Sequence, residues 1–236
     1  MMVRNKVSLL RRVACLLLIC SFGAIAQTFT ENTTGTHDGF NYELWFDNRG
    51  NAGTGSMTLT SGGTFSCQWE KAENFLARKG KKFNETQTFR QVGEIKVEYS
   101  CEYNPQGNSY MCVYGWTVNP LVEYYIVENY GTWRPPGSGF IETVTIDGES
   151  YDIYKTTRTD QPSIKGTATF DQYWSVCNTQ RTSGTIPVSK HFKQWKRLGL
   201  KMGKMNEVAF CIEGYQSSGN ATITKHILTV GKSTFK

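Results

Sequence analysis

The chain has 236 residues and a formal net charge of +6, from 26 lysines and arginines against 20 acidic residues. Four of the basic residues lie within positions 1–26, which hold no acid, so residues 27–236 carry a charge of only +2. The basic groups RKGKK (78–82) and KQWKR (193–197) are interpreted as solvated faces. Nucleic acid is excluded as a partner, because proteins that bind it show a clustered basic footprint.

The first 26 residues have the pattern of a secretory signal peptide. A basic stretch, MMVRNKVSLLRR, leads into the apolar run VACLLLIC, and AIA before Gln27 is a small-residue cleavage site. The apolar run is too short to span a membrane comfortably, and no second one follows. A membrane anchor and a lipoprotein attachment at Cys20 are the less favoured alternatives, the latter because Ile19 is bulkier than such sites accept. We therefore expect a secreted, extracellular protein that is not bound to a membrane.

Residues 27–236 are long enough to bury one sizeable core and are expected to form a single domain. Turn-forming stretches recur at short intervals, with alternating segments such as MTLT, EIKVEY, MCVYGWTV and YDIYKTT between them. This pattern predicts many antiparallel strands in an all-β sandwich or barrel. The turn stretches are DNRGNAGTG (47–55), SGG (61–63), NPQGN (104–108), PPGSG (135–139), DGES (147–150) and SSGN (217–220).

Two cysteines flank the stretch NPQG symmetrically. Cys101 and Cys112 could therefore face each other across a hairpin, where a disulfide is sterically permitted and export would favour it. No C-x-x-C occurs, so neither a zinc knuckle nor a thioredoxin-type site is predicted. At least one cysteine must stay unpaired, because five remain after residue 26: Cys67, Cys101, Cys112, Cys177 and Cys211.

The stretch VEYYIVENY, which begins at residue 122, is strand-like but contains two glutamates. Because successive residues of a strand point to opposite faces, Glu123 and Tyr125 share one face and Glu128 points to the other. Downstream, Glu213 and Tyr215 of CIEGYQSSG share a strand face in the same way. Two strands that each present a glutamate beside a tyrosine to a common concave surface suit glycoside hydrolysis. One carboxylate then attacks or stabilises the anomeric carbon, and the other protonates the leaving oxygen. Taken alone, however, a glutamate in a strand is more often an exposed edge residue or a paired structural charge.

One stretch, VSKHFKQWKRLGLKMG (188–203), has helical spacing. It predicts a single short helix laid on a sheet, with Ser189 as the N-cap and Gly199 as the stop. Its apolar positions are Val188, Phe192, Trp195 and Leu198.

The three histidines are scattered, and no metalloprotease, nucleophile-elbow or phosphate-loop motif occurs. His191, within the helix, is interpreted as a satisfied structural residue, whereas His37 and His226 lie far from it in the chain. A Ser-His-Asp or metal mechanism has no candidate residues, and no metal is predicted.

Several long motifs, in the right order, closely resemble family 11 glycoside hydrolases, the small endo-β-1,4-xylanases. The two signature regions of the family are similar to YGWTVNPLVEYYIVENYGTWRPPG (114–137) and EGYQSSGNATIT (213–224). The family's thumb is similar to YDIYKTTRTDQPSIKGTATFDQYWSV (151–176), and its lone helix to KHFKQWKRLGLKMG (190–203). The resemblance implies a β-jelly roll of two curved antiparallel sheets, which form a long cleft, with one helix on the back.

The resemblance also implies the activity, internal cleavage of xylan and xylo-oligosaccharides with retention at the anomeric carbon. Glu123 matches the nucleophile and Glu213 the general acid/base of the family. No cofactor is implied, and we expect a monomer. The substrate-binding positions implied by the matching motifs are Trp45 at the distal donor subsite, Asn74 beside the acid/base, Tyr114, Trp116 and Tyr125 near the nucleophile, the thumb tip Pro162, Ser163 and Ile164, and Gln172 and Tyr215 along the cleft.

Some positions depart from the common family pattern. Lys81 and Lys82 stand where many members carry a tryptophan, Cys177 replaces an arginine near the thumb, and Trp133 replaces a tyrosine. Two other classes remain as alternatives, a carbohydrate-binding β-sandwich without activity and a cellulase of a related jelly-roll family. A binding module would lack the paired glutamates, and the cellulase motifs differ from PLVEYYIVENYGTW.

Overall fold

The protein is described by a computed structural model over residues 26–47 and 53–236, so the predicted signal peptide lies outside the described residues apart from Ala26. No helix within these two ranges is long and apolar enough to cross a membrane. The elements in chain order are β1 (Gln27–Phe29), β2 (Thr33–His37), β3 (Phe40–Asp47), β4 (Thr54–Leu59), β5 (Phe65–Lys82), α1 (Phe89–Val92), β6 (Ile95–Val118), β7 (Val122–Tyr130), β8 (Phe140–Ile146), β9 (Glu149–Ser163), β10 (Gly166–Cys177), β11 (Ser183–Ile186), α2 (Val188–Arg197), β12 (Lys204–Val230) and β13 (Ser233–Phe235).

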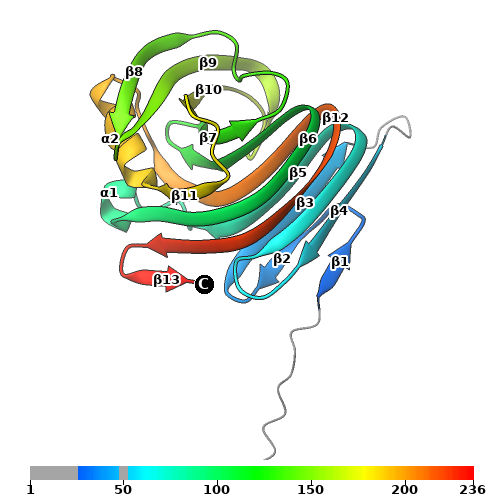
Figure 1. The fold of residues 1–236 in the computed structure, drawn as a ribbon. Helices are drawn as coiled ribbons and strands as arrows, with labels where there is room; N and C mark the ends of the chain where they lie inside the picture. Colours follow the sequence, from blue (N-terminus) through cyan, green and yellow to red (C-terminus); the bar gives the residue numbers. More distant parts are fainter. Residues whose placement is uncertain (1–25, 48–52) are drawn as a thin grey trace, which may run out of the picture.

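The strands form one sheet that curls over itself (Figure 1). Its main path runs β1-β4-β5-β12-β6-β7-β10-β9-β8, and the other strands pair beside it. The predicted all-β class is confirmed. Two details differ from the prediction of two antiparallel sheets: hydrogen bonds join the strands into one continuous 13-stranded sheet, and β7 and β10 run parallel. In that parallel pair Gln172 lies directly beside Glu123.

Two long strands replace predicted turns. The stretches NPQGN and SSGN lie inside β6 and β12, which continue through them for 24 and 27 residues. Gly107 adopts φ +107°, and the pairing of β12 shifts register after Tyr215. Such bulges bend a strand and increase its twist without reversing it. The two turn predictions are therefore wrong, because glycine here permits a bend within a strand.

The cysteine prediction fails for the same reason. Cys101 and Cys112 lie on one strand, β6, and do not face each other across a hairpin. Cys112 lies opposite Cys211 of β12 instead. Every cysteine that follows residue 26 is buried and free.

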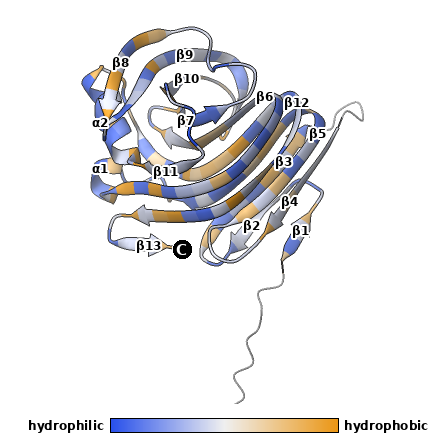
Figure 2. Ribbon diagram, viewed as in Figure 1, coloured by the Kyte–Doolittle hydropathy of each residue, from blue (hydrophilic) through white to orange (hydrophobic). Residues whose placement is uncertain are grey.

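Apolar side chains pack on both faces of the central strands. The main core lies on one face and includes Trp69, Tyr124 and Phe210, while a smaller cluster on the other face includes Tyr125 and Trp174. Hydrophobic and hydrophilic residues accordingly alternate along the long strands (Figure 2). Each large apolar side chain that becomes fully buried stabilises the fold by about 1.5–3 kcal/mol. We call the face that carries the smaller cluster the site face.

The predicted helix is present as α2, but it does not begin as expected. Pro187 precedes its first residue, and the buried hydroxyl of Ser189 binds the backbone of the β6 entry instead of capping the helix. The helix ends at the predicted place, since Gly199 adopts φ +81° just after it. The apolar side chains Val188, Phe192 and Trp195 pack into the main core. A second short helix, α1, has no counterpart in the prediction of one helix.

His191 is buried on α2, but it is not the satisfied residue that the sequence suggested. Neither ring nitrogen has a hydrogen-bond partner in the structure. The ring instead packs edge-on against Tyr151, with centroids 4.6 Å apart. Burial lowers the pKa of His191 to about 3, so the imidazole is neutral at physiological pH and acts as an apolar ring.

Candidate active site

Glu123 occupies the site face of β7, where three side chains donate hydrogen bonds to its carboxylate. Tyr114 of β6 and Tyr125 of β7 donate to Oε1 at 2.8 and 3.2 Å. Gln172 of β10 donates to Oε2 at 2.6 Å. Burial raises the pKa of Glu123, and these three donors oppose the rise because they favour the ionised form. The geometry is that of a carboxylate held in place and kept available as an anion.

Glu213 occupies the site face of β12, opposite Tyr110 of β6. Its Oε2 is buried and has no hydrogen-bond partner. Burial and then the negative charge of Glu123 raise the pKa of Glu213 to about 8, and the Tyr125 hydroxyl lowers it. The predicted pair of glutamates therefore meets on one face in two different environments. Near neutral pH Glu213 retains a proton, and Glu123 is the acceptor of three hydrogen bonds.

Aromatic rings surround the two carboxylates on the site face. Tyr125 stacks on Trp174 with centroids 3.9 Å apart and an interplanar angle of 4°. Trp116 donates from its indole N–H to the hydroxyl oxygen of Tyr114 at 2.6 Å. The hydroxyl oxygen of Tyr114 accepts this hydrogen bond, and its single hydrogen is donated to Glu123. The rings thus fix the donors that hold the carboxylate.

The other predicted site residues lie around this centre. Asn74 of β5 lies beside Tyr215 of β12, and its buried Oδ1 has no hydrogen-bond partner. Trp45 of β3 and Tyr215 are 37% and 44% exposed, so both leave an aromatic surface free for a ligand. Pro162 and Ser163 end β9, and Ile164 follows them and packs against the smaller cluster. None of these residues hydrogen-bonds to either glutamate within the part of the chain that the structure describes.

Several residues of the site were missed by the sequence analysis. Tyr110 faces the smaller cluster beside Glu213, and the alternation of β6 could have revealed it. Arg158 of β9 lowers the pKa of both glutamates, which no motif suggested. Arg78 was assigned to a solvated basic run but is 7% exposed, and its neighbour Lys79 is fully buried. For these two residues the interpretation of RKGKK as a solvated face is wrong.

Lys79 owes its burial to oxygen partners from another part of the chain. Its ammonium donates to the carbonyl oxygens of Gly62 and Thr64 and lies 3.2 Å from the ring nitrogen of His37. Burial lowers the pKa of Lys79 to about 8. These contacts secure the turn before β5 and lie away from the two glutamates.

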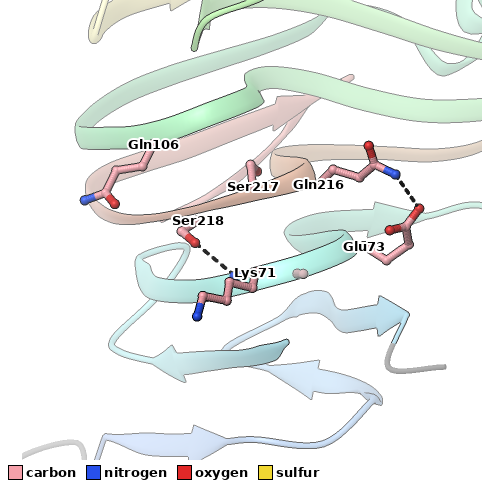
Figure 3. A pocket seen from close by; sticks show the side chains of 7 residues that line it. Lys71, Glu73, Gln106, Gln216, Ser217 and Ser218 are labelled. Atoms are coloured by element: carbon pink, nitrogen blue, oxygen red, sulfur yellow. Dashed lines mark hydrogen bonds between the residues drawn. The ribbon is translucent and has the colours of Figure 1, made fainter. Parts of the chain in front are cut away.

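A polar pocket lies where β5 and β12 bend, next along the chain from Asn74 and Tyr215 (Figure 3). It has a volume of about 400 Å³, and neither Glu123 nor Glu213 lines it. Gln216 donates to Glu73 at 2.9 Å, and the backbone N–H of Lys71 donates to Ser218 at 2.9 Å. Across residues 26–47 and 53–236, no three histidine, cysteine or acidic side chains are grouped so as to hold a metal ion.

Comparisons with known proteins agree with this geometry. The model of the family "Glycosyl hydrolases family 11" matches residues 37–224. Endo-1,4-beta-xylanase A of Thermoclostridium stercorarium is 56% identical over 220 residues, which cover 93% of this chain but 33% of that protein. Endo-1,4-beta-xylanase A of Bacillus pumilus is 53% identical over 215 residues, which cover 91% of this chain and 92% of that protein.

The fold is likewise shared with solved structures. The family 11 xylanase from Neocallimastix patriciarum superposes with a TM-score of 0.80 at 42% identity, over 86% of this chain and all of that one. The present chain spans only about a third of the length of the Thermoclostridium relative, so the likeness concerns only part of that protein. The family match, the identity and the common fold together show that the chain is a glycoside hydrolase and belongs to family 11.

Proposed function

We propose that the protein is an endo-β-1,4-xylanase that cleaves internal bonds of xylan and retains the configuration of the anomeric carbon. The observation that carries this proposal is the unequal environment of two carboxyl groups on one face. Glu123 accepts three hydrogen bonds, whereas the Oε2 of Glu213 accepts none and its pKa is raised to about 8. A carboxylate beside a carboxylic acid is what glycoside hydrolysis requires, and retention is proposed from the resemblance of the two signature regions to family 11.

In the first step Glu213 donates its proton to the glycosidic oxygen, and the carboxylate of Glu123 attacks the anomeric carbon. The bond to the leaving sugar breaks as the bond to Glu123 forms, which gives a covalent glycosyl-enzyme. The hydrogen bonds from Tyr114 and Gln172 fix the attacking carboxylate, so little reorganisation is needed when the reaction begins.

In the second step Glu213, now ionised, removes a proton from a water molecule. The hydroxide attacks the anomeric carbon from the side that the leaving sugar vacated, and Glu123 is released as a carboxylate. Because each step inverts the carbon once, the net result is retention. The pKa of Glu213 falls once Glu123 is esterified, since the negative charge that raised it has gone.

Xylan is proposed as the substrate because the relatives named above are called xylanases, and because exposed aromatic faces suit sugar rings. Trp45 and Tyr215 offer such faces at two places on the chain. Xylose lacks the hydroxymethyl group of glucose, so a site closed by the β9–β10 hairpin can reject glucan by steric clash. A non-catalytic binding module could use the same aromatics, but it has no need for the buried pair of glutamates.

The test is hydrolysis of β-1,4-xylan, with carboxymethylcellulose as the comparison polymer. We expect reducing ends and falling viscosity on xylan, little or no release from the cellulose derivative, and a β-anomer as the first product in proton NMR. Equal rates on both polymers would contradict the specificity, and an α-anomer would contradict retention. Binding to xylan without any hydrolysis would favour the carbohydrate-binding alternative.

Export is proposed from the sequence of residues 1–26. The basic stretch, apolar run and small-residue site predict cleavage before Gln27. The intact mass of protein recovered from the culture medium should therefore correspond to a chain that begins at Gln27. A full-length chain retained in the cell fraction would contradict this, and gel filtration of the same sample would test the expected monomer.

A further inference from the structure

Arg78 is a buried cation on the site face of β5 that the mechanism above does not use. Its guanidinium donates to Glu43 of β3 at 2.8 Å and to Glu207 of β12 at 3.1 Å. These two strands flank β5, so the arginine ties three neighbouring strands together. A buried ion pair of this kind is weak evidence for stability, because desolvation offsets much of the attraction. The placement of Arg78 therefore calls for a further explanation.

The guanidinium lies over the ring of Tyr114, with its central carbon 5.0 Å from the ring centroid. The strand register explains how it reaches there. Ala209 and Gly80 are the residues beside Tyr114 on β12 and β5, and both lack a long side chain. Neither residue therefore covers the Tyr114 ring with a long side chain, and the guanidinium of Arg78 lies there instead. A planar guanidinium on an aromatic face is an attractive contact that a lysine reproduces less well.

Tyr114 connects this cation to the carboxylate of Glu123. Its hydroxyl accepts a hydrogen bond from the indole of Trp116 at 2.6 Å and donates one to Glu123 Oε1 at 2.8 Å. The ring is thus held at one end by the indole of Trp116 and over its face by Arg78. A small tilt of the ring would move the hydroxyl that holds the attacking oxygen.

We propose that Arg78 is a positioning residue for the reaction, because its guanidinium, fixed by Glu43 and Glu207, orients the ring of Tyr114 and strengthens the hydrogen bond from Tyr114 to Glu123. This inference rests on the proposed function, since it assigns Glu123 the role of nucleophile. Arg78 has no contact with the reacting atoms; it acts through Tyr114, and its positive charge also lowers the pKa of Glu213.

The charges around these groups favour the same conclusion. Arg78 faces Glu207, Tyr114, Glu43 and Cys211. Burial and then the charge of Glu123 raise the pKa of the Tyr114 hydroxyl well above its ordinary value, and the positive charge of Arg78 opposes that rise. The groups that oppose this effect on Tyr114 are Glu123, Glu207 and Glu213, with Tyr125 packed against the ring. A more acidic hydroxyl is a stronger hydrogen-bond donor, and a stronger donor favours the ionised form of Glu123. Loss of Arg78 should therefore raise the pKa of Glu123.

The decisive variant removes the cation without changing the formal charge. Arg78→Met together with Glu207→Gln removes one positive and one negative charge, and Glu43 retains Lys82 as an ion-pair partner at 3.7 Å. Its reference is Glu207→Gln alone, because loss of Glu207 by itself lowers the pKa of Tyr114. Arg78→Lys is the conservative variant, because it keeps the charge and loses the planar face. The matched control is Arg181→Lys, which alters a similar buried pair with Glu128 on the opposite face of β7.

Two readouts are measured on each protein. The first is the pH dependence of kcat/KM on a xylo-oligosaccharide, whose acidic limb follows ionisation of Glu123. The second is a titration of the Glu123 carboxyl carbon by NMR, assigned by the signal that disappears in Glu123→Gln. The second readout needs no substrate, so it tests the contact even if the protein does not hydrolyse xylan. Inactivity of the wild type on xylan would overturn the proposed function alone.

Relative to Glu207→Gln, the double variant should lower kcat/KM roughly tenfold, as expected for a displaced catalytic group, and raise the Glu123 pKa by about half a unit. Arg78→Lys should fall between this variant and the wild type, and Arg181→Lys should leave both readouts unchanged. A folded double variant with an unaltered Glu123 pKa would overturn the proposal. If the double variant does not fold, Arg78→Lys decides: a rise in the Glu123 pKa supports positioning, and an unchanged value shows that Arg78 is structural only.

Discussion

At the scale of single residues, two glutamates of identical chemistry acquire different properties from their neighbours. Glu123 lies among three donors, so its ionised form is stabilised. Glu213 has a buried oxygen without a partner and a negative neighbour, so its protonated form is stabilised. Neither environment is local in sequence, because the donors to Glu123 come from three strands.

The first prediction concerns these carboxyl groups. Glu123→Gln and Glu213→Gln should each lower kcat on xylan by at least about a thousandfold, since removal of a group that acts directly in the reaction is not covered by neighbours. Both variants should remain folded, because an amide is of similar size; in Glu123→Gln the amide oxygen can still accept from Tyr114 and Tyr125, and only the hydrogen bond from Gln172 has no acceptor. Circular dichroism and thermal melting test the fold. The control is Glu102→Gln, an exposed glutamate of β6, which should retain full activity.

The second prediction concerns the pH profile. The proposed mechanism requires Glu123 ionised and Glu213 protonated, so the profile of kcat/KM should be bell-shaped, with a basic limb set by the Glu213 pKa of about 8. Asn74→Asp should shift the profile toward acid, because a second carboxyl beside Glu213 shares its proton and only the singly protonated pair is active. An unmoved or alkaline profile in the variant would show that Asn74 does not neighbour Glu213.

Part of this site could be predicted from the sequence, and there is a physical reason why the rest could not. The shared face of Glu123 and Tyr125 follows from the alternation of one strand, which is a local property. The burial of Arg78 and Lys79 depends on partners far along the chain, such as Glu207 and Gly62. A run of basic letters carries no sign of such partners, so it was assigned to the surface.

At the scale of elements, the β9–β10 hairpin is the predicted thumb. The Ser163 hydroxyl donates to the carbonyl of Gly166 at 2.6 Å and accepts from the backbone of Lys165, which rigidifies the tip. The ammonium of Lys165 donates to Glu85 at 2.9 Å, and Glu85 belongs to the segment between β5 and α1. One exposed ion pair therefore joins the tip of the hairpin to a different part of the molecule.

The third prediction concerns this ion pair. Lys165→Gln should raise KM for xylo-oligosaccharides up to about fivefold, because exposed pairs contribute about 0–1 kcal/mol and this one holds the hairpin near the site. The KM of the wild type should rise with added salt, whereas that of the variant should not. Lys225→Gln, which removes a similar exposed pair with Glu98, is the control. A salt response that persists in Lys165→Gln would contradict this role.

The strands show which features of an element cannot be predicted from the sequence. Alternation identified their class and the faces of β7, because burial on one face imposes a period of two. It could not tell a bend from a reversal at NPQGN and SSGN, because glycine and asparagine permit both. The pairing partners on either side decide the outcome, and β12 supplies them for β6 over almost its whole length.

At the scale of the whole molecule, buried histidines couple stability to pH. Burial lowers the pKa of His191 to about 3 and that of His226 to about 4. The unfolded chain binds a proton at each histidine near pH 6.5, whereas the folded protein does so only at much lower pH. The contribution of the two histidines to stability is therefore complete above pH 6.5 and is lost as pH falls toward 4. Glu213 has the opposite effect on stability, because its pKa is raised in the folded state. Its contribution is complete below pH 4.5 and is lost as pH rises toward 8.

The fourth prediction isolates one histidine from these opposing effects. His191→Phe keeps an aromatic ring against Tyr151 and removes the titrating group. The free energy of unfolding of the wild type, relative to that of the variant, should fall by up to about 1.4 kcal/mol per pH unit between pH 6.5 and 4. Urea denaturation at each pH measures it. Parallel pH dependences for the two proteins would contradict a depressed pKa for His191.

The position of β12 also governs how the chain folds as it is made. β12 lies between β5 and β6 and hydrogen-bonds to both, yet it follows both in the chain by more than 80 residues. Contacts of such sequence separation form slowly, and a nascent chain that ends before residue 204 has two long strand edges without their shared partner. We therefore expect the chain to stay unfolded until nearly all of it has been synthesised, because the strand that joins the two edges is made last. Chains cut before β12 should aggregate rather than accumulate as a folded fragment.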